Sequence, residues 1–233
     1  MVFDRFRPMQ GPGCAGVVAC NHQCNVLAGW LRQALELSRH RAATGNISIF
    51  AGTDRATFER MLPILTTLGR RVLHTGPIGS ASMLKVMTNY LATANLLTVC
   101  EAMVTMKAAG LDLATTYEAL RISSGTSFVH ETESQVILNG SRTIDFTMDL
   151  VLKDIGLFQK IADDADVPLE ISPLMIDIFK DGQARYGARA QSDDIIKRLE
   201  EATGLDITAP GFPAEMVDDE PEEAGYEVVV KRG

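Results

Sequence analysis

The sequence contains no apolar run long enough to cross a membrane as a helix. Its longest apolar stretch, residues 86–100, spans 15 positions and includes three threonines and two asparagines. A membrane helix needs about 18 or more uncharged residues. The first residues also lack the basic-then-apolar pattern of a secretory leader. We therefore expect a cytoplasmic protein that does not enter a membrane.

Cysteine is scarce as well. The four cysteines, Cys14, Cys20, Cys24 and Cys100, form no paired C-x-x-C units of the kind that bind zinc. Cys20, His22 and Cys24 could converge on a metal ion, but free reduced thiols are the simpler interpretation. We predict no metal site.

Basic residues are also fewer than acidic ones. The 233 residues carry a formal net charge of −8, which argues against binding to nucleic acid or to an anionic membrane surface. The hydrophobic fraction of 46% is sufficient for one good core or two small ones. These bounds favour a globular protein whose partners are small molecules or other protein chains.

A phosphate-binding glycine loop is not evident. The only G-x-G-x-x-G pattern is formed by Gly11, Gly13 and Gly16. A dinucleotide fingerprint follows a buried strand and has an acidic residue about 20 positions later. The ten residues before Gly11 do not resemble such a strand, and only Glu36 stands near the acidic position. We interpret the triplet as a flexible loop and expect residues 1–44 to be poorly ordered, with one possible helix at 28–39.

Short α/β elements are predicted after this segment. A strand at 47–51 is followed by a helix to about residue 68, for which Thr53 or Asp54 is the expected N-cap, and then by a strand at 71–74. The rest is predicted to be helical. Periodicity, caps and breakers indicate helices at about 79–109, 112–120, 128–138, 145–165, 168–186 and 192–203. From residue 205 the acidic chain is expected to be a solvated extension, with a possible edge strand at 226–230.

Lys85 is one of only three charged residues between positions 79 and 110. Burying a lone ammonium is costly, so this lysine needs a partner or a chemical task. Asn89 lies one helical turn later on the same face. A desolvated lysine beside an amide suits proton transfer to or from a substrate oxygen. The alternatives are a lysine that extends to solvent and a core amide satisfied by backbone.

The spacing of Gly76, Gly79, Lys85 and Asn89, together with the later block Lys-Asp-Ile-Gly-Leu at 153–157, resembles the β-hydroxyacid dehydrogenases. This group holds 3-hydroxyisobutyrate dehydrogenase and tartronate semialdehyde reductase, and the resemblance covers roughly residues 42 to 205. It implies a mainly α fold, in which a 6-phosphogluconate dehydrogenase C-terminal-like helical domain follows a remnant of a Rossmann α/β domain. The expected parts are an incomplete or divergent, truncated nucleotide-binding part (1–77), a helical substrate and dimerisation domain (78–204) and an acidic tail (205–233).

The resemblance also implies a function. The expected reaction is hydride transfer between NAD or NADP and a small 3-hydroxy acid or its semialdehyde, in a homodimer or higher homo-oligomer. The implied residues are Lys85 for catalysis, Asn89, Ser124 and Gly125 for the substrate, and Lys153 and Gly79 for the cofactor. Lys153 and Asp154 could instead be an ordinary surface pair. The alternative function is a non-catalytic helical dimerisation module derived from the same family.

Overall fold

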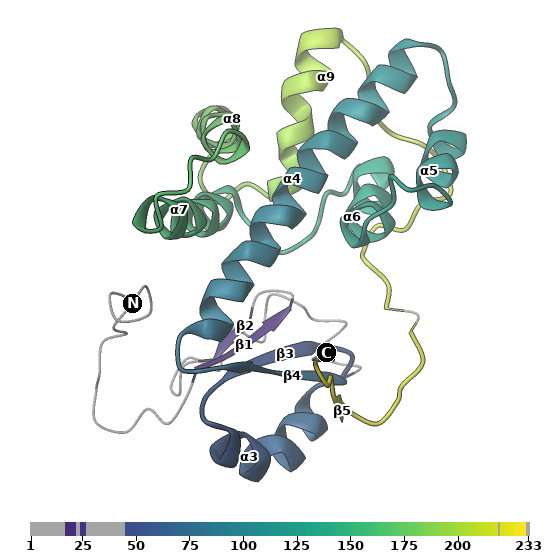
Figure 1. Ribbon diagram of the computed structural model, residues 1–233. Coiled ribbons are helices and arrows are strands. Elements are labelled where there is room, and N and C mark those ends of the chain that lie inside the picture. Colours follow the sequence, from purple (N-terminus) through teal and green to yellow (C-terminus); the bar gives the residue numbers. More distant parts are fainter. Residues whose placement is uncertain (1–16, 22–23, 27–44, 219, 232–233) are drawn as a thin grey trace. The chain divides into compact units, whose positions relative to one another are not determined.

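The computed structural model describes residues 17–21, 24–26, 45–218 and 220–231 (Figure 1). The chain forms two compact units. An α/β unit comprises Met1–Thr88, Asp163–Val167 and Asp218–Gly233, and a helical unit comprises Asn89–Ala162 and Pro168–Val217. The mainly α fold expected from the sequence is confirmed. No helix of the described residues is long and apolar enough to span a bilayer.

The described strands of the α/β unit form one five-stranded sheet with the order β2-β1-β3-β4-β5. The bounds are Val17–Asn21 for β1, Cys24–Val26 for β2, Ser48–Gly52 for β3, Arg71–Gly76 for β4 and Tyr226–Glu227 for β5. β1 is antiparallel to β2 and β3, whereas β3, β4 and β5 are parallel neighbours. Because parallel strands need a crossover, helix α3 (Arg55–Leu68) connects β3 to β4. Its buried Phe58 and Leu65 join a small core with Ile49, Ala51 and Val72.

The strands β1 and β2 lie within residues 1–44, for which the sequence predicted no element other than a possible helix at 28–39. The register pairs Val17 with Gly52 and Asn21 with Ser48 along the full length of β3. Adjacent valines favour extended backbone, and the open edge of β3 supplies hydrogen-bond partners that a reading of local sequence does not include. The predicted helix at 28–39, the glycine triplet and the side chains of the possible metal ligands lie outside the described residues, and the predicted poor order of residues 1–44 concerns mostly such residues.

The C-terminal segment extends the sheet and is not simply a solvated extension. The backbone N–H of Tyr226 donates to Arg70 O and that of Val228 donates to Val72 O, both at 2.8 Å. The predicted edge strand is therefore confirmed, although β5 is only two residues long. Gly225 permits the close approach, because a Cβ at this position would overlap the carbonyl oxygens of Thr66 and Gly69.

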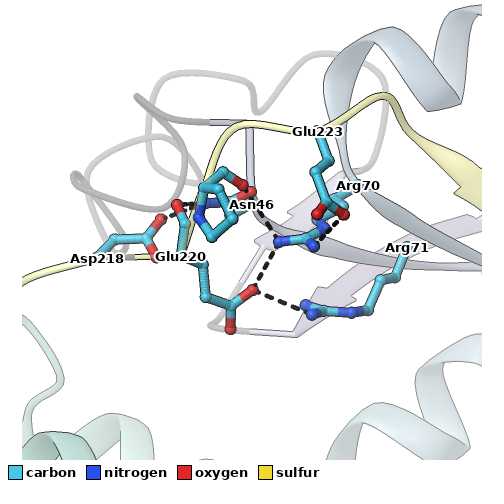
Figure 2. Close-up of polar contacts among 7 residues, drawn as sticks. Asn46, Arg70, Arg71, Asp218, Glu220 and Glu223 are labelled. Atoms are coloured by element: carbon cyan, nitrogen blue, oxygen red, sulfur yellow. Dashed lines mark hydrogen bonds and ion pairs between the residues drawn. The ribbon is translucent and has the colours of Figure 1, made fainter.

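Opposite charges hold this segment against the sheet (Figure 2). The guanidinium of Arg70, whose side chain is only 11% exposed, donates to Glu220 at 3.0 Å and to Glu223. Arg71 also pairs with Glu220 at 3.0 Å. The side-chain amide of Asn46 donates to Asp218 at 2.9 Å. The acidic composition of the tail thus complements the basic start of β4, a pairing that sequence composition alone presents as solvated charge.

We expect Arg70→Ala to release this segment from β4. The substitution removes a mostly buried guanidinium from its two carboxylate partners, Glu220 and Glu223, which should cost about 1–3 kcal/mol. Hydrogen exchange at the amides of Tyr226 and Val228 should accelerate about tenfold or more. Arg60→Ala is the matched control, because Arg60 is an exposed arginine of α3 that bonds to Thr57. Unchanged protection of both amides in Arg70→Ala would show that the ion pairs do not hold β5.

The helices of the second unit enclose a larger core. Helix α4 (Ser80–Ala108) begins in the α/β unit and continues into the helical unit. It is followed by α5 (Leu113–Arg121), α6 (Phe128–Asn139), α7 (Met148–Asp164), α8 (Ile171–Tyr186), a 3₁₀ segment η2 (Ser192–Ile196) and α9 (Lys197–Thr203). The predicted last helix is thus divided into two elements. Fully buried core side chains of this unit include Met103, Ile137, Met148, Ile155 and Phe179.

Residues 205–217 belong to the helical unit and do not begin a solvated tail. Ile207 is fully buried in the core. The backbone N–H of Ala209 donates to Leu138 O at 2.8 Å, and the side chain of Asn139 donates to Phe212 O at 2.8 Å. The ring of Phe212 also meets Tyr117 edge-on. This segment therefore closes the core beside α5 and α6.

Candidate active site

The loop between β4 and α4 requires glycine at two positions. Gly76 and Gly79 have φ angles of 106° and 98°, in the left-handed region that side-chain-bearing residues rarely adopt. Ser80 then starts α4: its backbone N–H donates to Pro77 O at 3.1 Å and its hydroxyl donates to the same oxygen at 2.7 Å. A Cβ on Gly79 would meet no atom within 4 Å, so the backbone there is open to close approach.

Lys85 lies on the second turn of α4 and is buried, with 4% of its surface exposed. This exposure rules out the alternative in which its ammonium simply extends into solvent. Asn89 follows one turn later on the same helix and is 8% exposed.

Within the helical unit, Asn89 and Lys153 share one partner that the sequence reading did not single out. The side-chain amide of Asn89 donates to Oδ2 of Asp154, which lies on α7. The Nζ of Lys153 lies 3.1 Å from Oδ1 of the same carboxylate. The two side chains of the Lys-Asp pair differ in exposure, at 50% for Lys153 and 11% for Asp154. The carboxylate of Asp154 is therefore mostly buried, while the cofactor role of Lys153 stays a prediction. Its place in the Lys-Asp block was the available signal for Asp154.

Ser124 and Gly125 lie in the exposed turn between α5 and α6. The N–H of Gly125 donates to the hydroxyl of Ser123 within the same turn, at 3.1 Å. In the described part of the chain, neither residue hydrogen-bonds to Asn89 or Asp154. The structure thus brings Asn89 and Lys153 together and leaves the role of this turn a prediction.

A second polar cluster of the helical unit was missed by sequence reasoning. Asp193 in η2 is fully buried, and no N–H group or alcohol among the described residues donates to its carboxylate oxygens. Its neighbour is the carboxyl of Glu133 on α6. Burial raises the pKa of Glu133 to about 7, an effect that the hydrogen bond with the Asp193 carboxyl partly offsets. Burial, followed by repulsion from Glu133, raises the pKa of Asp193 well above its ordinary value. Burial thus favours the protonated form of both carboxyls.

Two residues implied for the cofactor are described, each within its own unit. Gly79 of the α/β unit has open backbone, and Lys153 of the helical unit is half exposed. The glycine triplet lies outside the described residues. No cluster of three potential metal ligands occurs in the part that the structure describes.

Comparison with known proteins gives a consistent result. A family model described as "NAD-binding of NADP-dependent 3-hydroxyisobutyrate dehydrogenase" matches residues 79–199, more than half of the chain. The chain is 31% identical to 2-(hydroxymethyl)glutarate dehydrogenase of Eubacterium barkeri over 72% of this chain and 56% of the relative. It is 27% identical to L-threonate dehydrogenase of Escherichia coli over 65% of this chain and 51% of that protein. The chain thus spans about half the length of the curated relatives it matches.

Solved structures agree on the fold. The 3-hydroxyisobutyrate dehydrogenase of Salmonella typhimurium superposes with a TM-score of 0.63 at 24% identity, covering 68% of this chain and 56% of that one. The enzyme of the same name from Mycobacterium tuberculosis gives a TM-score of 0.61 at 21% identity, with the same coverage. The family model, which spans the helices carrying Lys85, Asn89 and Lys153, decides the assignment: the chain belongs to the 3-hydroxyisobutyrate dehydrogenase family.

Proposed function

We propose that this protein is an NAD(P)-dependent oxidoreductase that transfers hydride between the nicotinamide and a small 3-hydroxy acid or its semialdehyde. The observation that carries the proposal is the family pattern of Gly76, Gly79, Lys85 and Asn89 on one loop and helix. Lys85 is buried there, and Asn89 is held by Asp154.

The proposed chemistry assigns Lys85 to proton exchange with the substrate hydroxyl. Its ammonium form stabilises the alkoxide that develops as the carbinol is oxidised, and its amine form accepts the proton. Asn89 contacts the substrate through its side-chain amide. Ser124 and Gly125 are proposed to contact the substrate as well, since a Ser/Gly turn offers a hydroxyl and open backbone.

The bound nicotinamide supplies the redox chemistry, and the protein binds and orients it. Gly79 would leave room for it, and Lys153 would place a cation at its reactive end. The substrate class rests on the relatives, which are named for hydroxymethylglutarate and threonate, both small hydroxy acids.

Binding of NADH and NADPH tests the proposal directly. We expect titration followed by nicotinamide fluorescence to show saturable binding below the millimolar range. Lys153→Ala should weaken the affinity about threefold to tenfold, the effect of losing one exposed charged contact. Lys180→Ala, which removes an exposed lysine from α8, should leave it unchanged. If neither dinucleotide binds at millimolar concentration, the proposed enzyme function is refuted and the non-catalytic helical module is favoured.

Apolar surface on the helical unit supports the proposal of a homodimer. Leu91, Leu157, Ile171 and Leu174 are each more than 40% exposed. Burying such side chains against a second copy of the chain is favourable. A homodimer is equally compatible with the alternative function, the non-catalytic dimerisation module. Sedimentation at tens of micromolar should show a species larger than the 25.3 kDa chain. We place the protein in the cytoplasm, where a buried free thiol such as Cys100 stays reduced.

A further inference from the structure

Asp154 belongs to the second family motif and contacts Asn89, the last residue of the first motif. Its Oδ2 accepts a hydrogen bond from the side chain of Asn89, and its Oδ1 pairs with Lys153 at 3.1 Å. The three residues therefore share one carboxylate, although Asn89 and Asp154 are 65 positions apart in the sequence.

This contact determines which way the Asn89 amide is turned. The oxygen and nitrogen of an asparagine side chain are usually hard to distinguish, and the orientation has to be assigned from hydrogen-bond partners. An ionised carboxylate only accepts hydrogen bonds, so the group directed at Asp154 must be the NH₂ group of Asn89.

The helices around this contact keep Asp154 in place. Val151 and Ile155, its neighbours on α7, are buried in the core. Tyr90, next to Asn89 on α4, stacks on Phe158 of α7 with ring centroids 4.3 Å apart and an interplanar angle of 20°. Because these apolar contacts flank the polar one, neither carboxylate nor amide has much room to change rotamer.

We infer that Asp154 is a positioning residue, which holds the amide of Asn89 in the orientation that the proposed reaction uses. This inference rests on the proposed dehydrogenase function and sharpens it. Asp154 acts on the reaction through Asn89, whose amide it fixes by the hydrogen bond from Nδ2 to Oδ2.

Steady-state kinetics test the coupling of Asp154 to Asn89. Asp154→Ala is expected to lower kcat about 10-fold to 100-fold with a smaller change in KM, as expected when a reacting group is misplaced. In an Asn89→Ala background the same substitution should cost less than about threefold, because the group that Asp154 positions is already gone. Asp154→Asn keeps an acceptor oxygen and should recover part of the loss. Asp149→Asn is the control: it changes a carboxylate at the start of the same helix, which pairs with Arg189. If the decrease in kcat of the double variant equals the product of the two single decreases, the inference is wrong.

The side-chain amide signals of Asn89 give a readout that does not depend on activity. In the ¹⁵N spectrum of the full chain, the NH₂ pair missing from Asn89→Ala identifies this residue. We expect its protons to exchange with water at least about tenfold faster in Asp154→Ala, because a buried charge-assisted hydrogen bond is lost. Unchanged shifts and exchange would refute the contact.

The two readouts separate this inference from the proposed function. A wild-type chain that turns over no hydroxy acid with either dinucleotide refutes the dehydrogenase function, and the Asn89 amide signals then decide alone whether Asp154 holds the amide. An active wild type with an unaffected Asp154→Ala refutes the positioning role and leaves the dehydrogenase function intact.

Discussion

Replacing Lys85 with alanine is expected to lower kcat for hydroxy acid oxidation by at least about 10², the scale of losing a general acid–base group. The measurement requires a form of the protein that binds the dinucleotide, either the chain itself or a fusion to a complete nucleotide-binding domain. The reason is the position of Lys85, a 4%-exposed amine one turn before Asn89 on α4. The proposed mechanism loses both its proton acceptor and its positive charge with this side chain.

Two further variants distinguish a chemical role of the Lys85 side chain from a role in packing. Lys85→Met keeps most of the side-chain volume and should lose as much activity as Lys85→Ala, while keeping the thermal midpoint close to that of the wild type. Lys85→Arg keeps the charge but does not release a proton, so it should remain strongly impaired. Lys107→Ala, in the last turn of the same helix, is the control. A decrease in kcat smaller than threefold, with the fold intact, would remove Lys85 from the mechanism.

The second large effect is expected on stability. We predict that the free energy of unfolding of the helical unit falls by roughly 2–3 kcal/mol between pH 5 and pH 8, because of the carboxyl pair formed by Glu133 and Asp193. Burial raises the pKa of Glu133 from its ordinary 4.5 to about 7, so the folded chain keeps a proton that the unfolded chain releases. Raising the pH through this window therefore favours unfolding.

The charged groups around the pair do not remove this effect. Repulsion from Asp194 adds to the raised pKa of Asp193, and attraction to Arg142 opposes it. Arg142 is mainly engaged by Glu200, whose two carboxylate oxygens each lie 2.7 Å from Nη2. The buried thiol of Cys100 is close enough to interact with both carboxyls, and burial raises its pKa well above the ordinary value, so it stays neutral here.

Glu133→Gln isolates the contribution of Glu133, since it removes this titrating group while keeping the size and a hydrogen-bond donor for Asp193. Denaturant titrations of this variant should show a smaller loss of stability from pH 5 to pH 8. The difference between variant and wild type is the relevant quantity, because Asp193 still titrates, and because burial lowers the pKa of His130 and its titration makes stability rise with pH in part of the same window. The control Glu131→Gln changes an exposed carboxylate of the same helix. Equal pH dependence in wild type and Glu133→Gln would show that the raised pKa of Glu133 does not contribute.

Features that depend on a few neighbouring residues could be predicted from the sequence. Helix α4 was expected at 79–109 and spans Ser80–Ala108. Asp112 caps α5 by accepting from the N–H of Thr115 at 2.7 Å, and Gly140 ends α6 in the left-handed region. Such signals act within one helical turn, so chain order contains them. The spacing of Lys85 and Asn89 is of the same kind, because helix geometry alone places them on one face.

Features that join distant segments were decided only by tertiary structure. The C-terminal strand β5 pairs with β4, which lies more than 150 positions earlier in the sequence. Strand β1 pairs with β3 along the edge opposite β4. Strand pairing requires a partner edge, which local sequence does not specify.

The polar contacts of the helical unit follow the same rule. Asp154 meets Asn89, and Glu133 meets Asp193, only because apolar cores dock the helices that carry them. The sequence by itself determined the helices, their ends and the motif residues of the family. The orientation of the Asn89 amide by Asp154 and the raised pKa of Glu133 depend on burial and on neighbours that are distant in the sequence. This environment exists only once the chain is folded.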